Sequence, residues 1–192
     1  EKDIEKYGWP IDDIYLFEVI KNLDNAGSSS IVLDLYRNVG VGKGADQLAS
    51  FSKENPKVIS IFNVAEGIAS IPNFPAERQA FNDIPVDVDN VIRRNLVGVD
   101  RKKFKLPPQF VSIPSRMVEI HQKFNNKIFD IDEQFSEGKI NTIKKYSGGY
   151  TNVDSNGVQI LIDYPRSNYV PKYSIESILS KNFSKDFFKN KM

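Results

Sequence analysis

Apolar residues in the first part of the chain switch between a helical spacing and short continuous runs. Over 11–25 they recur every three or four positions, which predicts an amphipathic helix with one buried face. Continuous apolar runs over 30–36 and 57–63 predict buried strands, and Asp46 stands where a helix between them should begin. A strand, a helix and a strand at this spacing form a βαβ unit, so we expect the two strands to be parallel.

The rest of the chain is less regular. Residues 67–85 contain three prolines and no clear period, so we expect a long irregular segment, the best candidate for a moving element. The other predicted elements are strands over 87–99 and 158–164, a helix over 111–124, and a helix over 175–179 capped by Ser174. Together these elements predict a single α/β domain with a mixed central sheet and helices on both faces.

Composition narrows the classes of function. The 192 residues are 40% hydrophobic and 27% charged, as expected for one globular domain. With 26 Lys and Arg against 25 Asp and Glu, the net charge of +1 argues against a nucleic-acid partner, which needs a basic face. The short basic run of Arg101, Lys102, Lys103 and Lys105 is interpreted as a solvated loop.

Cysteine and histidine usage excludes further chemistry. The chain has no Cys, which excludes disulfides, Cys-ligated zinc and thiol catalysis. Its single His, His121, disfavours a His-based triad or a multi-His metal site and is interpreted as an ordinary helix residue. We therefore expect no metal and no cofactor.

The glycine-rich segment 40–44 invites a phosphate-loop interpretation that its sequence does not support. Gly40-Val41-Gly42-Lys43-Gly44 matches neither the P-loop nor the dinucleotide-binding fingerprint. Asp46 follows directly, and an acidic helix start repels phosphate. We interpret this segment as a flexible loop.

One candidate ligand site lies where the first strand ends. Asp34 closes that strand, and such positions line ligand crevices in α/β sheets. Arg37 is its expected partner, so the two residues form either a structural ion pair or part of a ligand site.

A second candidate site surrounds the strand that follows Asp87. Asp87 and Asp89 either bind a cation or form a capped turn, with Asn90 in the left-handed region. Arg93 and Arg94 should point to opposite faces, so that one of them either grips an anion or forms a surface salt bridge. Near the end of the chain, Tyr164 is interpreted as a packing residue whose hydroxyl reaches a rim. The complete predicted ligand set is Asp34, Arg37, Asp89, Arg93 and Tyr164.

Several segments occur in an order typical of one known family. They are Gly8-Trp9-Pro10 and its helix; Ile31-Val32-Leu33-Asp34 with Asp46-Gln47-Leu48-Ala49; Asp87-Val88-Asp89-Asn90-Val91-Ile92-Arg93-Arg94; and Leu161-Ile162-Asp163-Tyr164 with Tyr173-Ser174-Ile175. In this order the chain resembles the CHASE2 domain, the extracytoplasmic sensor module of bacterial membrane-bound cyclases and kinases. It departs from the family where Ile11 follows Pro10, in place of Trp, and where Asn90 replaces Gly. Trp9 is expected to plug the core and anchor the junction with a membrane helix.

The resemblance implies a sensor that is not an enzyme. It would bind an unknown small ligand outside the cytoplasmic membrane and pass a conformational change to a cytoplasmic output domain. No run of the chain approaches the length needed to span a bilayer. The last strand and the flanking membrane helices are therefore expected outside residues 1–192, and the full-length receptor is a candidate homodimer.

Two alternatives remain at this point. The first is a small α/β hydrolase that uses carboxylates, which would require a carboxylate pair with a raised pKa in a deep cleft. The second is an adhesive or structural surface module, which would present a flat surface without a polar cavity near Asp34.

Overall fold

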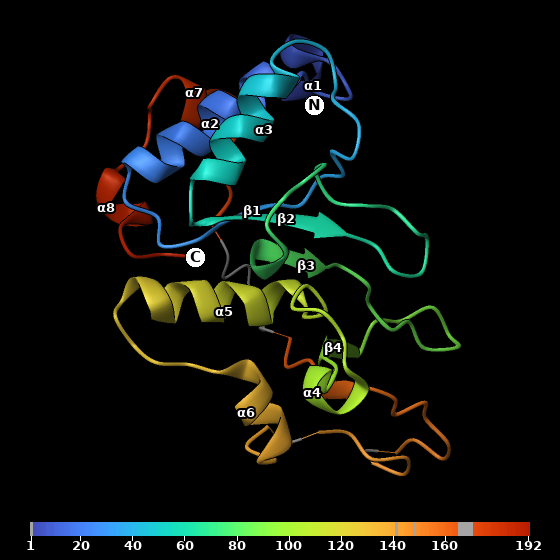
Figure 1. Ribbon diagram of the computed structural model, residues 1–192. Coiled ribbons are helices and arrows are strands. Elements are labelled where there is room, and N and C mark those ends of the chain that lie inside the picture. The colour runs from blue at the N-terminus through green and yellow to red at the C-terminus, as the bar shows by residue number, and fades with distance from the viewer. Residues whose placement is uncertain (1, 141, 148, 165–170) are drawn as a thin grey trace.

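The chain forms a parallel sheet of three strands and an antiparallel sheet of two, with helices around them (Figure 1). The structure is a computed structural model that describes residues 2–140, 142–147, 149–164 and 171–192. The elements are α1 (Lys2–Tyr7), α2 (Asp13–Asn25), β1 (Ile31–Leu33), α3 (Ala45–Glu54), β2 (Val58–Phe62), η1 (Ala76–Arg78), β3 (Gln79–Phe81), β4 (Arg94–Gly98), α4 (Arg101–Phe104), α5 (Ile113–Phe124), α6 (Ile131–Ser136), β5 (Val158–Leu161), α7 (Ile175–Leu179) and α8 (Lys185–Phe188).

The parallel sheet carries the core on both of its faces. Its order is β1-β2-β3, with Ile31 opposite Val58. Successive side chains of a strand point to opposite faces, so Val58 joins the cluster under α2 and α3 while Ile59 packs with Ile120 of α5. Figure 1 shows α2, α3 and α7 on one side of this sheet and α5 on the other. The predicted α/β class with helices on both faces is confirmed.

The antiparallel pairing occurs in a separate two-stranded sheet, formed by β4 and β5. Arg94 lies opposite Leu161, and the register shifts between Leu96 and Gly98. Isolated bridges from Phe81 to Ser112 and from Gly98 to Val111 connect the two sheets through the segment that precedes α5. The parallel and antiparallel parts of the predicted mixed sheet are therefore joined through this linking segment.

The elements with a clear local pattern lie where the sequence predicts them. Helix α2 occupies the predicted 11–25 region, and Ser174 Oγ accepts a hydrogen bond from Ser177 N at 3.0 Å at the start of α7. The βαβ unit of β1, α3 and β2 has parallel strands as predicted. Within the segment predicted to be irregular, η1 and β3 form a short turn and a three-residue strand.

Three local predictions are wrong. The strand expected over 87–99 begins only at Arg94, because residues 87–91 close a turn in which Asp87 N donates to Val91 O and Asn90 N donates to Asp87 O. The basic run lies partly in α4, not in a loop. Trp9 is 69% exposed and cannot plug the core, whereas Ile11, only 2% exposed, is buried just after it.

The glycine-rich segment 40–44 caps the N-terminus of α2. Backbone N–H groups of Asp13 and Ile14 donate to the carbonyls of Val41 and Lys43 at 2.9 and 2.7 Å. Gly44 has φ +87°, and a Cβ there would lie 2.6 Å from the backbone of Ile14. Only glycine permits this approach, so the glycines serve packing and the predicted flexible loop is held in place.

Candidate functional site

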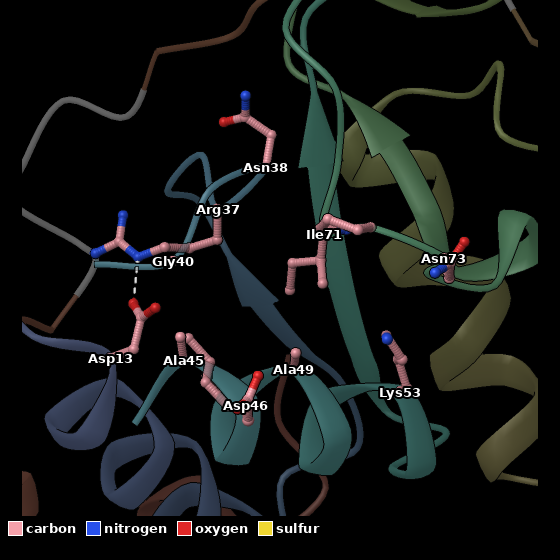
Figure 2. Close-up of a pocket in the computed structure, with 12 residues that line it drawn as sticks. Asp13, Arg37, Asn38, Gly40, Ala45, Asp46, Ala49, Lys53, Ile71 and Asn73 are labelled. Atoms are coloured by element: carbon pink, nitrogen blue, oxygen red, sulfur yellow. Dashed lines mark hydrogen bonds and ion pairs between the residues drawn. The ribbon is translucent and has the colours of Figure 1, made fainter. Parts of the chain in front are cut away.

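A buried ion pair joins the start of α2 to the segment after β1 (Figure 2). Arg37 Nε donates to Asp13 Oδ1 at 2.5 Å, and Val41 N donates to Asp13 Oδ2 at 2.9 Å. The other guanidinium nitrogens donate to the carbonyls of Tyr36 and Ile11 at 2.9 and 3.1 Å. The two residues are only 1% and 8% exposed, so each buried charge is paired and hydrogen-bonded.

This ion pair corrects the prediction for Asp34. Strand β1 ends at Leu33, and Asp34 is exposed beyond it. Arg37 turns instead toward Asp13, because the glycine-rich segment brings the start of α2 beside it. Sequence reasoning missed Asp13, whose position in the first turn of a helix has an ordinary local explanation.

A polar cavity of about 220 Å³ opens beside this ion pair. Its walls come from the ion pair, from one side of α3, and from residues 71–73 of the predicted moving segment. Figure 2 shows Asp46 and Lys53 of α3 and Asn38 and Asn73 of the two loops around it. Both charge signs and two amides are therefore available to a polar ligand.

The second predicted site is a charged cluster around the start of β4. Arg93 binds Asp89 through two hydrogen bonds of 2.8 and 2.7 Å and reaches Asp87 at 3.1 Å. Asn90 has φ +61° in the turn between them, as predicted. A capped turn was one of the two alternatives for Asp87 and Asp89, the other being a cation site. Both carboxylates form ion pairs with Arg93. No group of three potential metal ligands gathers anywhere in the described residues.

Arg93 and Arg94 differ in exposure, although Arg93 precedes β4 and both side chains bind Asp87. The Arg93 side chain is 46% exposed, whereas that of Arg94 is 8% exposed. Arg94 binds Asp87 at 2.7 Å and donates to Gln159 Oε1 at 2.7 Å. Tyr150 donates to Asp87 at 2.6 Å, and this bond, with those of the two arginines, lowers the pKa of Asp87. Gln159 and Tyr150 carry no sequence signal, because they lie far along the chain.

Tyr164 lies beside this cluster. It is exposed, and its hydroxyl donates to the carbonyl of Ile92 at 2.8 Å. Three of the predicted residues, Asp89, Arg93 and Tyr164, therefore gather at β4, while Asp34 and Arg37 follow β1 in the other sheet. The predicted set is divided between two places.

The Asp89 carboxyl should titrate far below its ordinary pKa. The hydrogen bonds from Arg93 lower its pKa from 3.8 to about 2. Because the folded-state pKa lies below the unfolded one, this contact stabilises the fold above about pH 4, and its contribution is lost as the pH falls toward 2. A ¹³C NMR titration of wild type and Arg93→Gln measures it: the midpoint should rise toward 3.8 in the variant. An unchanged midpoint would contradict the assignment.

The family is decided by comparison with known proteins. Residues 1–192, the whole chain, match the CHASE2 domain. The chain belongs to the CHASE2 domain family. No curated protein and no solved structure shows a significant match to it. CHASE2 domains are extracytoplasmic sensor domains of signalling receptors, which agrees with the resemblance found in the sequence.

Two further observations bear on what this CHASE2 domain does. Across the described ranges, no helix combines the length and the apolar character needed to cross a bilayer. Burial raises the pKa of Glu119, the feature that the hydrolase alternative requires, but Arg116 binds this carboxylate and Arg101 lies 3.8 Å from it. Such an arginine-held carboxylate is poorly suited to act as a general base.

Proposed function

We propose that this CHASE2 domain binds a small polar ligand in the cavity beside Asp13 and Arg37 and transmits the bound state to both ends of the domain. The observation that carries the proposal is that α2, whose first residue lines the cavity, also contacts the first helix, α1, and the helix before the last, α7. A ligand shifts a conformational equilibrium only if it binds the two states with different affinity. Segment 67–85, which supplies Ile71 and Asn73 to the cavity, is the part proposed to move.

Contacts from α2 lead to both α1 and α7. Asn22 Nδ2 donates to the carbonyl of Ile178 in α7 at 3.1 Å, and both residues are buried. The Tyr7 ring of α1 meets the Tyr15 ring of α2 edge-on, with centroids 4.8 Å apart. A shift of α2 would therefore change its contacts with both α1 and α7.

Helices α1 and α7 are also joined to each other. Asp3 Oδ2 accepts a hydrogen bond from Ile175 N at 2.8 Å, at the start of α7. Lys6 and Tyr7 of α1 both donate to the Glu176 carboxylate. These polar contacts join the first helix to α7, which precedes the last helix, α8 (Lys185–Phe188). We propose that they couple two flanking membrane segments, and through them a cytoplasmic cyclase or kinase, in a receptor that works as a homodimer.

The gene sequence on both sides of the chain tests the receptor part of the proposal. Apolar stretches of about 20 residues, long enough to span a bilayer, are expected on the flanks. Sequence without such stretches on both sides would contradict the proposal.

Glu176→Gln tests the coupling between α1 and α7. Removing the charge weakens the hydrogen bonds from Lys6 and Tyr7, so the basal output of the full-length receptor should change by about twofold or more. Glu18→Gln is the matched control, because among the described residues Glu18 forms an ion pair only with Lys21 of its own helix, at 3.4 Å. Output is measured as the cyclase or kinase activity of the cytoplasmic domain, in membranes that contain equal amounts of each receptor variant. Equal rates for the two variants would argue against transmission through this contact.

A further inference from the structure

A second cavity, of about 620 Å³, lies on the other side of the parallel sheet, against α5. Its walls come from Pro56 and Lys57 before β2, from η1, from the C-terminal half of α5, and from residues 127–129 after that helix. None of its lining residues belongs to the Asp13–Arg37 cavity. It is a separate site to which the proposed function assigns no role.

The wall of this cavity contains a buried cation without a carboxylate partner. Arg78 is 8% exposed, and its guanidinium donates to main-chain carbonyls, those of Ser52 and Val58 at 2.8 and 3.2 Å and also those of Lys53 and Asn55. These acceptors are neutral, and no carboxylate of the described residues lies within ion-pair distance of Arg78. Burial lowers the pKa of Arg78, as expected for a charge that its neighbours do not balance.

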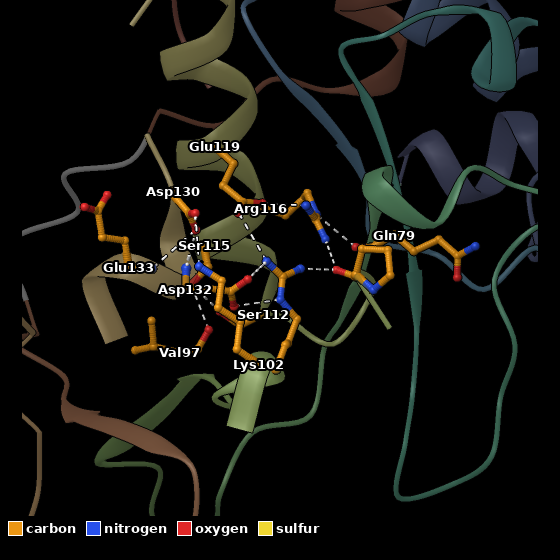
Figure 3. A network of polar contacts seen from close by, with 12 residues as sticks. Gln79, Val97, Lys102, Ser112, Ser115, Arg116, Glu119, Asp130, Asp132 and Glu133 are labelled. Carbon is orange, nitrogen blue, oxygen red and sulfur yellow. Dashed lines mark hydrogen bonds and ion pairs between the residues drawn. The ribbon is translucent and has the colours of Figure 1, made fainter. Parts of the chain in front are cut away.

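One of the two acidic residues in the same wall, Glu119, is already neutralised (Figure 3). Arg116 binds Glu119 and donates to the carbonyl of Gln79 at 3.1 Å. Arg101 lies 3.8 Å from Glu119 and binds both carboxylate oxygens of Asp132 at 2.9 Å. Two arginines thus balance two carboxylates. Arg101 is half-buried in this network, so the prediction of a solvated basic run is wrong for it.

Two lysines at the mouth of the cavity are free. Lys123 and Lys127 are exposed, and neither has a carboxylate within ion-pair distance among the described residues. The cavity is lined by five cationic side chains, Lys57, Arg78, Arg116, Lys123 and Lys127, and by two acidic ones, Glu77 and Glu119. Lys57 is already paired with Asp24 at 2.5 Å, and Arg116 is paired with Glu119. The excess of positive charge therefore comes from Arg78, Lys123 and Lys127 against Glu77, and it favours an anion.

The rest of the lining is apolar and partly uncovered. Ile128 is fully exposed and Phe124 is 43% exposed, although large apolar side chains usually find cover. Lys57 Nζ lies 5.2 Å from the centre of the Phe124 ring, so cationic and apolar surface are interleaved. A purely polar anion would leave this surface in water, whereas an apolar body would cover it.

We propose that this cavity binds an amphipathic organic anion, with its carboxylate head near Lys123 and Lys127 and its apolar body against Phe124 and Ile128. The cavity volume of about 620 Å³ lies in the range of small-molecule sites. This would be a second ligand site of the domain. Because binding is measured on the 192-residue chain alone, it does not depend on signal output, and either proposal can fail without the other.

Octanoate, used below its micelle concentration, is the probe. We expect it to shift the ¹⁵N NMR signals of Lys57, Phe124 and Lys127 in a saturable way. Acetate supplies the head alone and octanol the body alone, and each should bind about tenfold more weakly or not at all, since each lacks half of the contacts. Octanoate that fails to bind, or acetate that binds equally well, would overturn the proposal.

Charge removal tests the location. Lys123→Gln with Lys127→Gln should weaken octanoate binding about fivefold to tenfold, the size expected for two exposed ion pairs. The control is Lys181→Gln with Lys185→Gln, which removes the same charge from exposed positions outside the cavity and should leave binding unchanged. Equal losses in the two double variants would mean non-specific attraction and refute the site. Cosedimentation with phosphatidylglycerol vesicles, in a chain that does not bind free octanoate, would assign the surface to a membrane and refute the small-molecule proposal.

Discussion

Asp13→Ala should lower the free energy of unfolding by about 3–5 kcal/mol, because it leaves the Arg37 guanidinium buried without its counter-charge. The Asp13 carboxylate is nearly inaccessible, and it also accepts the backbone N–H of Val41. Its loss therefore removes an ion pair and a hydrogen bond that fixes the glycine-rich segment on α2. Urea unfolding followed by circular dichroism measures the change.

Two control variants separate this effect from a general weakening of α2. Asp12→Ala removes the neighbouring carboxylate, which is only half-buried and accepts a long 3.4 Å hydrogen bond from Lys43 N, so it should cost less than about 1 kcal/mol. Asp13→Ala with Arg37→Met removes both charges and should recover part of the stability lost in the single variant. If the double variant were less stable than Asp13→Ala by the full cost of a second independent substitution, the ion pair would not be the cause.

Arg78→Ala should lower the free energy of unfolding by about 3–4 kcal/mol, because it deprives several main-chain carbonyls of their donor. The guanidinium connects the C-terminal turn of α3 to the start of β2, and it packs 4.8 Å from the centre of the Phe74 ring. Its removal breaks the contacts that hold the end of α3 to the start of β2 within the βαβ unit. The same urea unfolding measurement applies.

Arg93→Ala is the matched control for Arg78→Ala. Arg93 donates three hydrogen bonds to carboxylates, but its own side chain is 46% exposed, and surface ion pairs contribute less than about 1 kcal/mol each. A smaller loss is therefore expected despite the stronger apparent pairing. Comparable losses in the two variants would show that burial does not decide the cost here.

The local elements follow from short-range pattern alone. The helical spacing before Asn25 and the apolar run before Asn63 predict α2 and β2. Both patterns can be recognised in the sequence without knowing which other segment the element packs against. Ser174 caps α7 through its own neighbours, so the cap is also predictable. The ordered set of such segments was enough to indicate the CHASE2 family.

The candidate sites depend on contacts that no local pattern encodes. Arg37 binds Asp13, and not Asp34, which is closer in sequence, because the glycine-rich segment folds back on α2. Arg94 donates to Gln159 on the other strand of the antiparallel sheet. Trp9 is exposed because the neighbouring Ile11 is the residue that enters the core. The sequence by itself thus determined the principal helices, the parallel β1–β2 pair and the family. Only the tertiary structure decided which charges are paired and which cavity keeps a positive excess, because burial and ion pairing arise between segments distant in the chain.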